Sequence, residues 1–480
     1  MRDVSEGVGG MREEHDALGV KQVPEGALYG IQTARARENF AISGLPPRAE
    51  LVGGIVTVKK AAAQINAELG VLSAEKAAAI VAAADEVLGG LHLDQFVVDP
   101  FQAGAGTSHN MNANEVLANR ANEILADAQA GGARAVSVRG TYAPVHPNDD
   151  VNHGQSSNDA IPTAIRIALQ QPGARLSSEL ARLQHELEVK AREFDHILKS
   201  ARTHLQDAVP IRLGQEFAAY AASVRKARGR VELALAEARA LSIGGTAAGT
   251  GLNAHPQFGA LMVERLSVLT GMEFTAAPDR IQATMSLDDL VALSAALRGT
   301  ALSLIQIAND LRLLSSGPRT GLAEIVLPAV QPGSSIMPGK VNPVMAEMLD
   351  MVCFHVVGAD AAVAMAGQAG QLEINVMTPL VAWELLFSLE ILANGVAAFT
   401  DRCVSGIVAD EEQCRHWSER SLGLATALNP TIGYEQAAEV AKEAFASGKT
   451  VPEVVLERGI LSADELVEKL DPAALTEPHE

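Results

Sequence analysis

The 480-residue sequence has few aromatic residues and too few cations to balance its acids. Phe, Trp and Tyr make up only 4% of the chain, whereas 48% of its residues are apolar. Because sheet cores draw heavily on aromatic and β-branched side chains, this composition favours closely packed helices. The formal net charge is −20. Since phosphate binding requires clustered Lys and Arg, this charge argues against nucleic acid as a partner.

Disulfide, secretory and membrane signals are also missing. The three cysteines (Cys353, Cys403 and Cys414) are widely spaced without a Cys-x-x-Cys pair, which predicts reduced thiols in a cytoplasmic protein. Residues 1–16 are rich in charge and contain no apolar signal-peptide core. The uncharged run 240–263 is long enough to span a membrane, but its five glycines and one proline predict loops instead.

Long helices are predicted in the middle of the chain. Apolar residues recur at steps of three and four from Leu176 to Leu198, and Pro172 and Gly173 are expected to precede the start of that helix. Three further helices are expected at residues 286–314, 350–369 and 380–399. The first of these is apolar on most sides, so we expect it to be buried in an oligomer.

Breaks rich in glycine and proline divide these helices from their neighbours and predict three domains. Residues 1–154 form a mixed, mostly helical N-terminal domain, and residues 155–408 form a central long-helix bundle that includes the loop described next. Residues 409–480, with shorter and more charged helices, form a small C-terminal domain.

Residues 333–343 (GSSIMPGKVNP) are the most informative segment of the chain. They combine glycines, two serines, one lysine, one asparagine and two prolines without any acid. Glycines let a ligand approach the main chain, and N–H groups of such a loop can face an anion. Hydroxyls beside Lys340 suit a carboxylate better than a metal ion. A phosphate-binding P-loop is excluded because five residues separate Gly333 from Gly339 and Val341 follows the lysine. A plain surface loop is the alternative.

Three further segments share this polar character, namely residues 104–112, 146–159 and 202–208. Hydroxyls and amides at the start of a helix can bind carboxylates, although an N-capping loop is the plain alternative. No metal site is predicted, because His146 and His153 lack a His-Glu-x-x-His motif or a cysteine pair. Structural roles are expected for these two histidines.

The loop and these three segments, taken in order, resemble the motifs of the aspartase/fumarase superfamily, from about residue 14 to residue 470. The resemblance implies a mainly α, three-domain fold whose central long-helix bundle assembles into a tetrameric helical core. It also implies a small dicarboxylate substrate, active sites shared between three subunits of a homotetramer, and no organic cofactor. Activation by Mg²⁺ is left open.

The resemblance assigns roles to individual residues. Ser334 corresponds to the base that removes the Cβ proton, with Lys340 and neighbouring N–H groups as the physical candidates for stabilising its alkoxide. Lys340 and Asn342 correspond to residues that hold the α-carboxylate. The remaining substrate-binding candidates are Thr107, Ser156, Ser157 and Ser335 for the other carboxylate and Asn158, Thr203 and His204 for the leaving group. Ser108 is a further substrate-binding candidate, and Glu347 corresponds to the acidic partner of His204.

The substrate preference is drawn from smaller differences. Ala105 stands where class II fumarases usually have serine, which favours an aspartase, whereas Ser157 and Gly339 are the fumarase-like choices. His109 and His153 match neither pattern. We expect an ammonia-lyase that converts L-aspartate to fumarate by anti-elimination through an aci-carboxylate. A class II fumarase and a non-catalytic binding relative are the alternatives.

Overall fold

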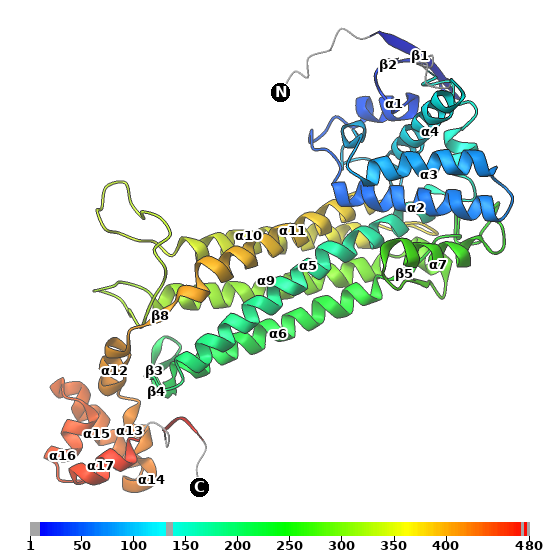
Figure 1. Ribbon diagram of the computed structural model, residues 1–480. Coiled ribbons are helices and arrows are strands. Elements are labelled where there is room, and N and C mark those ends of the chain that lie inside the picture. The colour runs from blue at the N-terminus through cyan, green and yellow to red at the C-terminus, as the bar shows by residue number, and fades with distance from the viewer. Residues whose placement is uncertain (1–9, 131–137, 472–474, 478–480) are drawn as a thin grey trace. The chain divides into compact units, whose positions relative to one another are not determined.

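A computed structural model describes residues 10–130, 138–471 and 475–477. The described chain is mainly helical, and its strands pair only as two-stranded sheets (Figure 1). It divides into two compact units, each made of three chain segments. Unit 1 comprises Met1–Leu176, Arg230–Arg298 and His355–Ile391, and unit 2 comprises Ser177–Gly229, Gly299–Phe354 and Leu392–Glu480. These units do not follow the three-domain division, which stays a prediction.

Unit 1 begins with an antiparallel hairpin followed by short and medium-length helices. In the hairpin, Met11 is paired with Pro24 and Asp16 with Gly19. The elements that lie wholly in unit 1 are β1 (Met11–Asp16), β2 (Gly19–Pro24), α1 (Ile31–Asn39), α2 (Ala49–Glu68), α3 (Ala74–Leu88), a 3₁₀ turn (Leu93–Gln95), α4 (Thr107–Gln129), a π-helical turn (Pro147–Val151), β5 (Ala240–Leu241), α7 (Phe258–Thr270), β6 (Thr275–Ala276) and α8 (Arg280–Met285). Residues 240–263 thus form a short strand, loops and the start of a helix, as predicted, and no membrane helix.

Five long helices begin in one unit and end in the other. They are α5 (Ser157–Glu193), α6 (Leu213–Glu237), α9 (Asp288–Leu314), α10 (Val344–Gln368) and α11 (Thr378–Arg402). The last three confirm the helices predicted at 286–314, 350–369 and 380–399. The periodic leucines of α5, from Leu176 to Leu187, are fully buried, which is what their spacing predicts.

The predicted start of the first long helix was wrong. Pro172 and Gly173 lie inside α5, which begins at Ser157. A proline costs a helix one hydrogen bond, but burial on both sides of this position outweighs that loss. The glycine has its own reason, because a Cβ atom at Gly173 would lie 2.5 Å from side-chain atoms of Leu235 on α6. Gly173, which was predicted to precede the helix, instead permits close packing of α5 against α6.

Unit 2 contains a hairpin, the loop and the C-terminal helices. Its own elements are β3 (Leu198–Thr203), β4 (Gln206–Arg212), β7 (Ile325–Val326), a 3₁₀ turn (Val404–Gly406), β8 (Val408–Ala409), α12 (Glu411–Arg420), α13 (Leu424–Ala427), α14 (Asn429–Ile432), α15 (Tyr434–Ser447), α16 (Val451–Glu457) and α17 (Ala463–Lys469). Leu428, Val440 and Val454 are fully buried in the core of the C-terminal helices. Short charged helices were expected there.

The three cysteines are free and buried, as expected of small core residues. Burial raises the pKa of each thiol to about 12, so none of them is an activated nucleophile.

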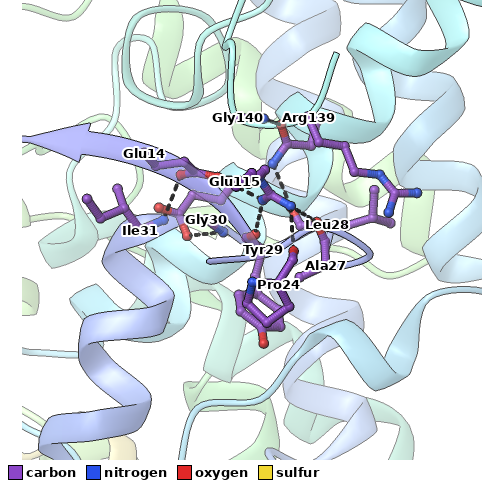
Figure 2. Close-up of polar contacts among 12 residues, drawn as sticks. Glu14, Pro24, Ala27, Leu28, Tyr29, Gly30, Ile31, Glu115, Arg139 and Gly140 are labelled. Carbon is purple, nitrogen blue, oxygen red and sulfur yellow. Dashed lines mark hydrogen bonds and ion pairs between the residues drawn. The ribbon is translucent and has the colours of Figure 1, made fainter. Parts of the chain in front are cut away.

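Two buried carboxylates hold the start of α1 in unit 1. Figure 2 shows Glu14 and Glu115 beside Gly30 and Ile31. Glu115, on α4, accepts hydrogen bonds from the N–H groups of Gly30 (2.9 Å), Gln32 (2.9 Å) and Thr33 (3.2 Å). Glu14 accepts the N–H of Ile31 at 2.8 Å. The positive end of this helix is therefore occupied by the protein's own acids and is not available to a ligand.

This arrangement predicts a pH dependence of stability. Burial raises the pKa of Glu115 to about 7 from its ordinary 4.5, against the opposing effect of its hydrogen-bond donors. The folded state then holds the proton more tightly than the unfolded state, so this contribution is complete below pH 4.5 and is lost as the pH rises through about 7. Because Glu115→Gln cannot ionise, the unfolding free energy of the wild type minus that of the variant should fall between about pH 5 and pH 8. Urea unfolding of both proteins at pH 5 and at pH 8 measures this difference in unfolding free energy. A difference that stays constant over this range would mean that the donors keep Glu115 ionised in the fold.

Candidate active site

The polar segments of unit 1 meet where two helices begin. Thr107 is the first residue of α4, and Ser157 is the first residue of α5. Gly106 precedes Thr107 with φ of 83°, and a Cβ atom there would lie 2.7 Å from the side chain of Ile161 on α5. The amide of Asn110 donates to Ser157 Oγ at 3.1 Å. The two helix starts are thus packed together, so their partial positive charges add in one place and can bind an anion despite the net charge of −20.

Most of the first polar segment, residues 104–112, is helical, because α4 starts at Thr107 and includes Ser108 in its first turn. The asparagines of this segment favour a loop, because their side chains usually compete with the helix for backbone hydrogen bonds. Here their partners come from elsewhere in the fold: the amide of Asn112 donates to the carbonyl of Gln95 and accepts from the N–H of Val97.

A buried aspartate shapes the start of α5. Asp159 is fully buried and accepts hydrogen bonds from the N–H groups of Ser156 (2.8 Å), Gly244 (3.0 Å) and Thr246 (2.9 Å). Burial raises the pKa of this carboxyl, and the three N–H donors oppose that shift. Asn158 donates from Nδ2 to the carbonyl of Ala247 at 2.7 Å. These contacts fix the backbone around Ser156–Asn158 before any substrate arrives.

The histidines of these segments have structural contacts. His146 Nδ1 accepts the N–H groups of Asn148 and Asp149 and so caps the π-helical turn. His153 Nδ1 lies 3.1 Å from the carbonyl oxygen of Asp149. His109 is buried, and burial lowers its pKa to about 4, which keeps the ring neutral. Within the described ranges, no group of three or more His, Cys, Asp or Glu side chains is placed to hold a metal ion.

The loop that carries Ser334 belongs to unit 2 and lies between α9 and α10, where Figure 1 shows long segments without helix. Its two ends are joined: the N–H of Gly333 donates to the carbonyl of Lys340 at 2.8 Å, and Asn342 Nδ2 donates to the carbonyl of Gly333 at 2.7 Å. Only glycine fits at 333, because a Cβ atom would lie 2.6 Å from the Lys340 carbonyl oxygen.

Ser334 Oγ sits within hydrogen-bonding distance of its own loop backbone. It accepts the N–H groups of Ile336 (3.2 Å) and Met337 (3.0 Å). Two N–H donors on a serine oxygen favour its deprotonated form, since each bond strengthens as the oxygen gains charge. Ser335 and Lys340 are exposed in the same loop. The hydroxyls and the cation are thus presented to solvent by a closed backbone frame.

Thr203 and His204 lie in the β3–β4 hairpin, where Thr203 is paired with Gln206. The helix α5 stops at Glu193, and the leucine at 198 already belongs to β3. His204 and Leu205 form the tip, with φ of 55° and 59°. Left-handed backbone at residues other than glycine costs of order 1–3 kcal/mol each and is often found at functional sites. The tip therefore holds His204 exposed in a strained turn.

This hairpin is anchored by a buried acid next to the loop. Glu324, fully buried, lies 2.8 Å from Lys199 Nζ and accepts from Arg202 at 2.8 Å. Both cations are on β3, and Arg202 is adjacent to Thr203. Glu324 itself directly precedes β7, which leads into the loop. A single carboxylate thus ties the hairpin to the segment that begins the loop.

Glu347, the predicted partner of His204, contacts another residue within the single chain. Glu347, in the first turn of α10, lies 3.9 Å from Arg312. Among the described residues, no hydrogen bond or ion pair joins Glu347 or the Ser334 loop to His204. The predicted site residues therefore fall into separate groups: Thr107, Ser108, Ser156, Ser157 and Asn158 in unit 1, and Thr203, His204, Ser334, Ser335, Lys340, Asn342 and Glu347 in unit 2.

Sequence reasoning missed four supporting residues. Asn110, Asn152 and Asp159 lie within the polar segments, but the predicted site residues there were the hydroxyl-bearing side chains and Asn158. Lys59 gave no signal at all, because it lies in an alanine-rich helix beside a surface lysine.

Comparison with known proteins agrees with the mainly helical fold and the polar motifs. Residues 19–358 match the family described as Lyase, and residues 424–477 match the Fumarase C C-terminus. The chain is 45% identical to the aspartate ammonia-lyase of Bacillus subtilis over 97% of this chain and 96% of that protein. It is 51% identical to the class II fumarate hydratase of Halobacterium salinarum over 97% of each.

Solved structures extend this likeness to three dimensions. A fumarate lyase:delta crystallin from Brucella melitensis bound to cobalt has a TM-score of 0.92 at 48% identity, covering 98% of this chain and 100% of that one. The class II fumarase of Schistosoma mansoni has a TM-score of 0.93 at 37% identity, with the same coverage. The protein is a lyase, and it belongs to the aspartase/fumarase superfamily.

Proposed function

We propose that this lyase removes ammonia from L-aspartate to give fumarate. The observation that carries the proposal is the Ser334 oxygen, which accepts two backbone N–H groups inside a loop that also presents Lys340. Several relatives are aspartate ammonia-lyases that are 45–47% identical to this chain over nearly its whole length. Together they favour a serine alkoxide acting beside a bound carboxylate.

In the proposed reaction, Ser334 takes the Cβ proton of the substrate, and the electron pair of the C–H bond moves into the neighbouring carboxylate. The resulting aci-carboxylate carries two negative charges. Thr107, Ser156 and Ser157 at the two helix starts, with Ser108 beside them and Ser335 from the loop, supply donors to it. Since such donors act only as the charge grows, each is worth roughly 3–4 kcal/mol in the transition state.

The second step breaks the Cα–N bond. Lys340 and Asn342 hold the α-carboxylate, and Asn158, Thr203 and His204 line the leaving-group side. Because the amino group of aspartate is already protonated, ammonia leaves without a further proton, and the double bond of fumarate forms. No organic cofactor takes part in these steps. Activation by Mg²⁺ remains open to experiment.

A class II fumarase is the second candidate, favoured by the 51% identity to the Halobacterium salinarum enzyme. Water differs from ammonia in needing a proton in order to leave, which would demand a general acid on the leaving-group side. An absorbance assay for fumarate with L-aspartate and then with L-malate distinguishes the two. Product from malate alone would overturn the first proposal, and product from neither would favour a binding relative.

We further propose that the protein is a cytoplasmic homotetramer with sites shared between subunits. Within the part of the chain that the structure describes, three helices could cross a membrane by length and composition alone: α9, α10 and Thr378–Gly406. Their exposed surface includes large apolar side chains, such as Leu302 (53% exposed), Met351 (65%) and Phe354 (58%). Yet the same helices bury charged groups, including Asp350 and Asp360. Charges facing inward and apolar residues facing outward fit an oligomeric helical core.

This proposal predicts an effect of Phe354→Glu. A charge in the centre of a buried helical interface should lower the particle mass from that of a tetramer, measured by light scattering without detergent. Val467→Glu, on the C-terminal helix α17 and 75% exposed, is the control that should keep the mass unchanged. An unchanged mass for Phe354→Glu, or protein recovered only with detergent, would contradict the tetrameric core.

A further inference from the structure

A fully buried lysine lies beneath the proposed carboxylate site of unit 1. Lys59, on α2, is 0% exposed, and its Nζ donates to Asn152 Oδ1 at 2.8 Å and to Gln155 Oε1 at 2.9 Å. Burying an amine that has no carboxylate in hydrogen-bonding contact is costly. Burial lowers the pKa of Lys59 to about 7, and the charge of Asp159 opposes that shift. Core packing alone would be served better by methionine, which has no such cost.

The lysine sets the direction of the hydrogen bonds that lead away from it. An amine with two or three N–H groups donates to both oxygens, whether it is neutral or charged. Asn152 must therefore present Oδ1 to Lys59, and its Nδ2 donates to the carbonyl of Gln155 at 3.2 Å. The same Oδ1 accepts from Asn110 Nδ2 at 3.1 Å. Asn110 is thereby held with its NH₂ group towards Asn152.

The series of hydrogen bonds from Lys59 through Asn152 and Asn110, called the relay below, ends at a residue that is proposed to bind substrate. The Asn110 NH₂ group also donates to Ser157 Oγ at 3.1 Å. Since Ser157 accepts from Asn110, its hydroxyl hydrogen must point to another acceptor. A substrate carboxylate accepts hydrogen bonds and donates none. Reversing the amide of Asn110 would place an oxygen beside Ser157, and the hydroxyl hydrogen would then be drawn away from the substrate.

We propose that Lys59 is a positioning residue that, through Asn152 and Asn110, makes Ser157 an obligatory hydrogen-bond donor to the substrate carboxylate. The proposal rests on the carboxylate-binding role proposed for Ser157. A positioning role differs from a packing role in one testable respect. If Lys59 acts by positioning, its removal must have no effect on kcat/KM once Ser157 has lost its hydroxyl.

A double-mutant cycle tests this difference. Ser157→Ala should lower kcat/KM for the preferred substrate by roughly 10²–10³-fold, the usual effect of losing one such donor. Lys59→Met keeps the length of the side chain without its donors and should lower kcat/KM at least roughly 10-fold. The double variant should be no worse than Ser157→Ala alone, within about threefold. If the two losses multiply instead, the proposal is overturned.

Matched variants separate the relay from general damage. Lys60→Met changes the neighbouring lysine, whose ion pair with Asp85 is at the surface, and should leave kcat/KM unchanged. Asn152→Leu breaks the relay at its second link and should reproduce the cycle with Ser157→Ala. This second cycle decides the question if Lys59→Met does not fold, as judged by circular dichroism and thermal unfolding.

Succinate affinity, measured by calorimetry, provides a readout without chemistry. Non-additive losses of succinate binding support the relay even if neither L-aspartate nor L-malate is converted, in which case only the proposed function fails. Additive losses, or no succinate binding by the wild type, overturn the inference itself.

Discussion

Ser334→Ala should lower kcat by roughly 10²–10⁴-fold, the range expected when a positioned base is lost. Its oxygen accepts the N–H groups of Ile336 and Met337, and no other atom of this side chain can take a proton. The loop frame should survive, because the bonds of Gly333 with Lys340 and Asn342 do not involve the serine side chain.

The decisive measurement is exchange of the substrate's Cβ hydrogen with deuterium from solvent, followed by NMR. A lost base stops exchange, whereas loss of a donor to the developing charge slows exchange and leaves it detectable at saturation. Ser335→Ala is the matched neighbour: it keeps the Ser334 hydroxyl, so exchange should be slower than in the wild type but still measurable. Full exchange by Ser334→Ala would remove this residue from the role of base.

The same variant tests whether sites are shared between chains. Ser334→Ala leaves Thr203 and His204 intact, so mixing it with a Thr203→Ala/His204→Ala variant should create some sites with all three side chains. We expect partial recovery of activity after subunits are exchanged by mild denaturation and refolding. Refolding each variant alone is the control, and no gain on mixing would place each complete site within one chain.

Glu324→Gln should destabilise the protein by about 3 kcal/mol, because removing one partner of a buried ion cluster leaves the others uncompensated. Lys199 is 1% exposed and would keep only Glu216 as an acidic partner, at 2.8 Å. Arg202 would lose its bond to Oε1. Glutamine has the same size, so the effect would report charge and not a cavity.

Urea unfolding measures this loss as a lower midpoint at unchanged slope. Glu179→Gln removes one of the two acidic partners of Arg182 at the surface, leaving Asp401, and should change the midpoint little. Since Arg202 adjoins Thr203, kcat/KM of Glu324→Gln should also fall at temperatures where the protein is still folded. A midpoint equal to that of the control would show that the buried cluster contributes nothing to the anchor.

Candidate site residues could be singled out from the sequence where polar chemistry is concentrated in short segments. The 333–343 loop carries its hydroxyls, lysine and glycines in eleven residues, and Gly333 indeed lies where no side chain would fit. The helical core was predictable for a similar reason, since the leucines of α5 and the apolar length of α9 repeat at the period of a helix. Both signals are local in sequence.

Errors arose where a residue's partner is distant in sequence. Pro172 and Gly173 read as a boundary, because nothing nearby reveals that Leu235 packs against the glycine. Leu198 was assigned to the long helix, because nothing beside it in the sequence reveals that it pairs with Arg212 on β4. Lys59 was passed over, because its oxygen partners lie about ninety residues away.

The sequence by itself therefore determined the helical class, the superfamily motifs and the candidate residues for binding a small diacid. Only the tertiary structure decided where helices α4 and α5 begin, that a buried lysine is linked by hydrogen bonds to Ser157, and which acid holds the His204 hairpin. The physical reason is range: helical periodicity and loop chemistry act between near neighbours, whereas burial, charge pairing and the direction of a hydrogen bond depend on groups that folding brings together.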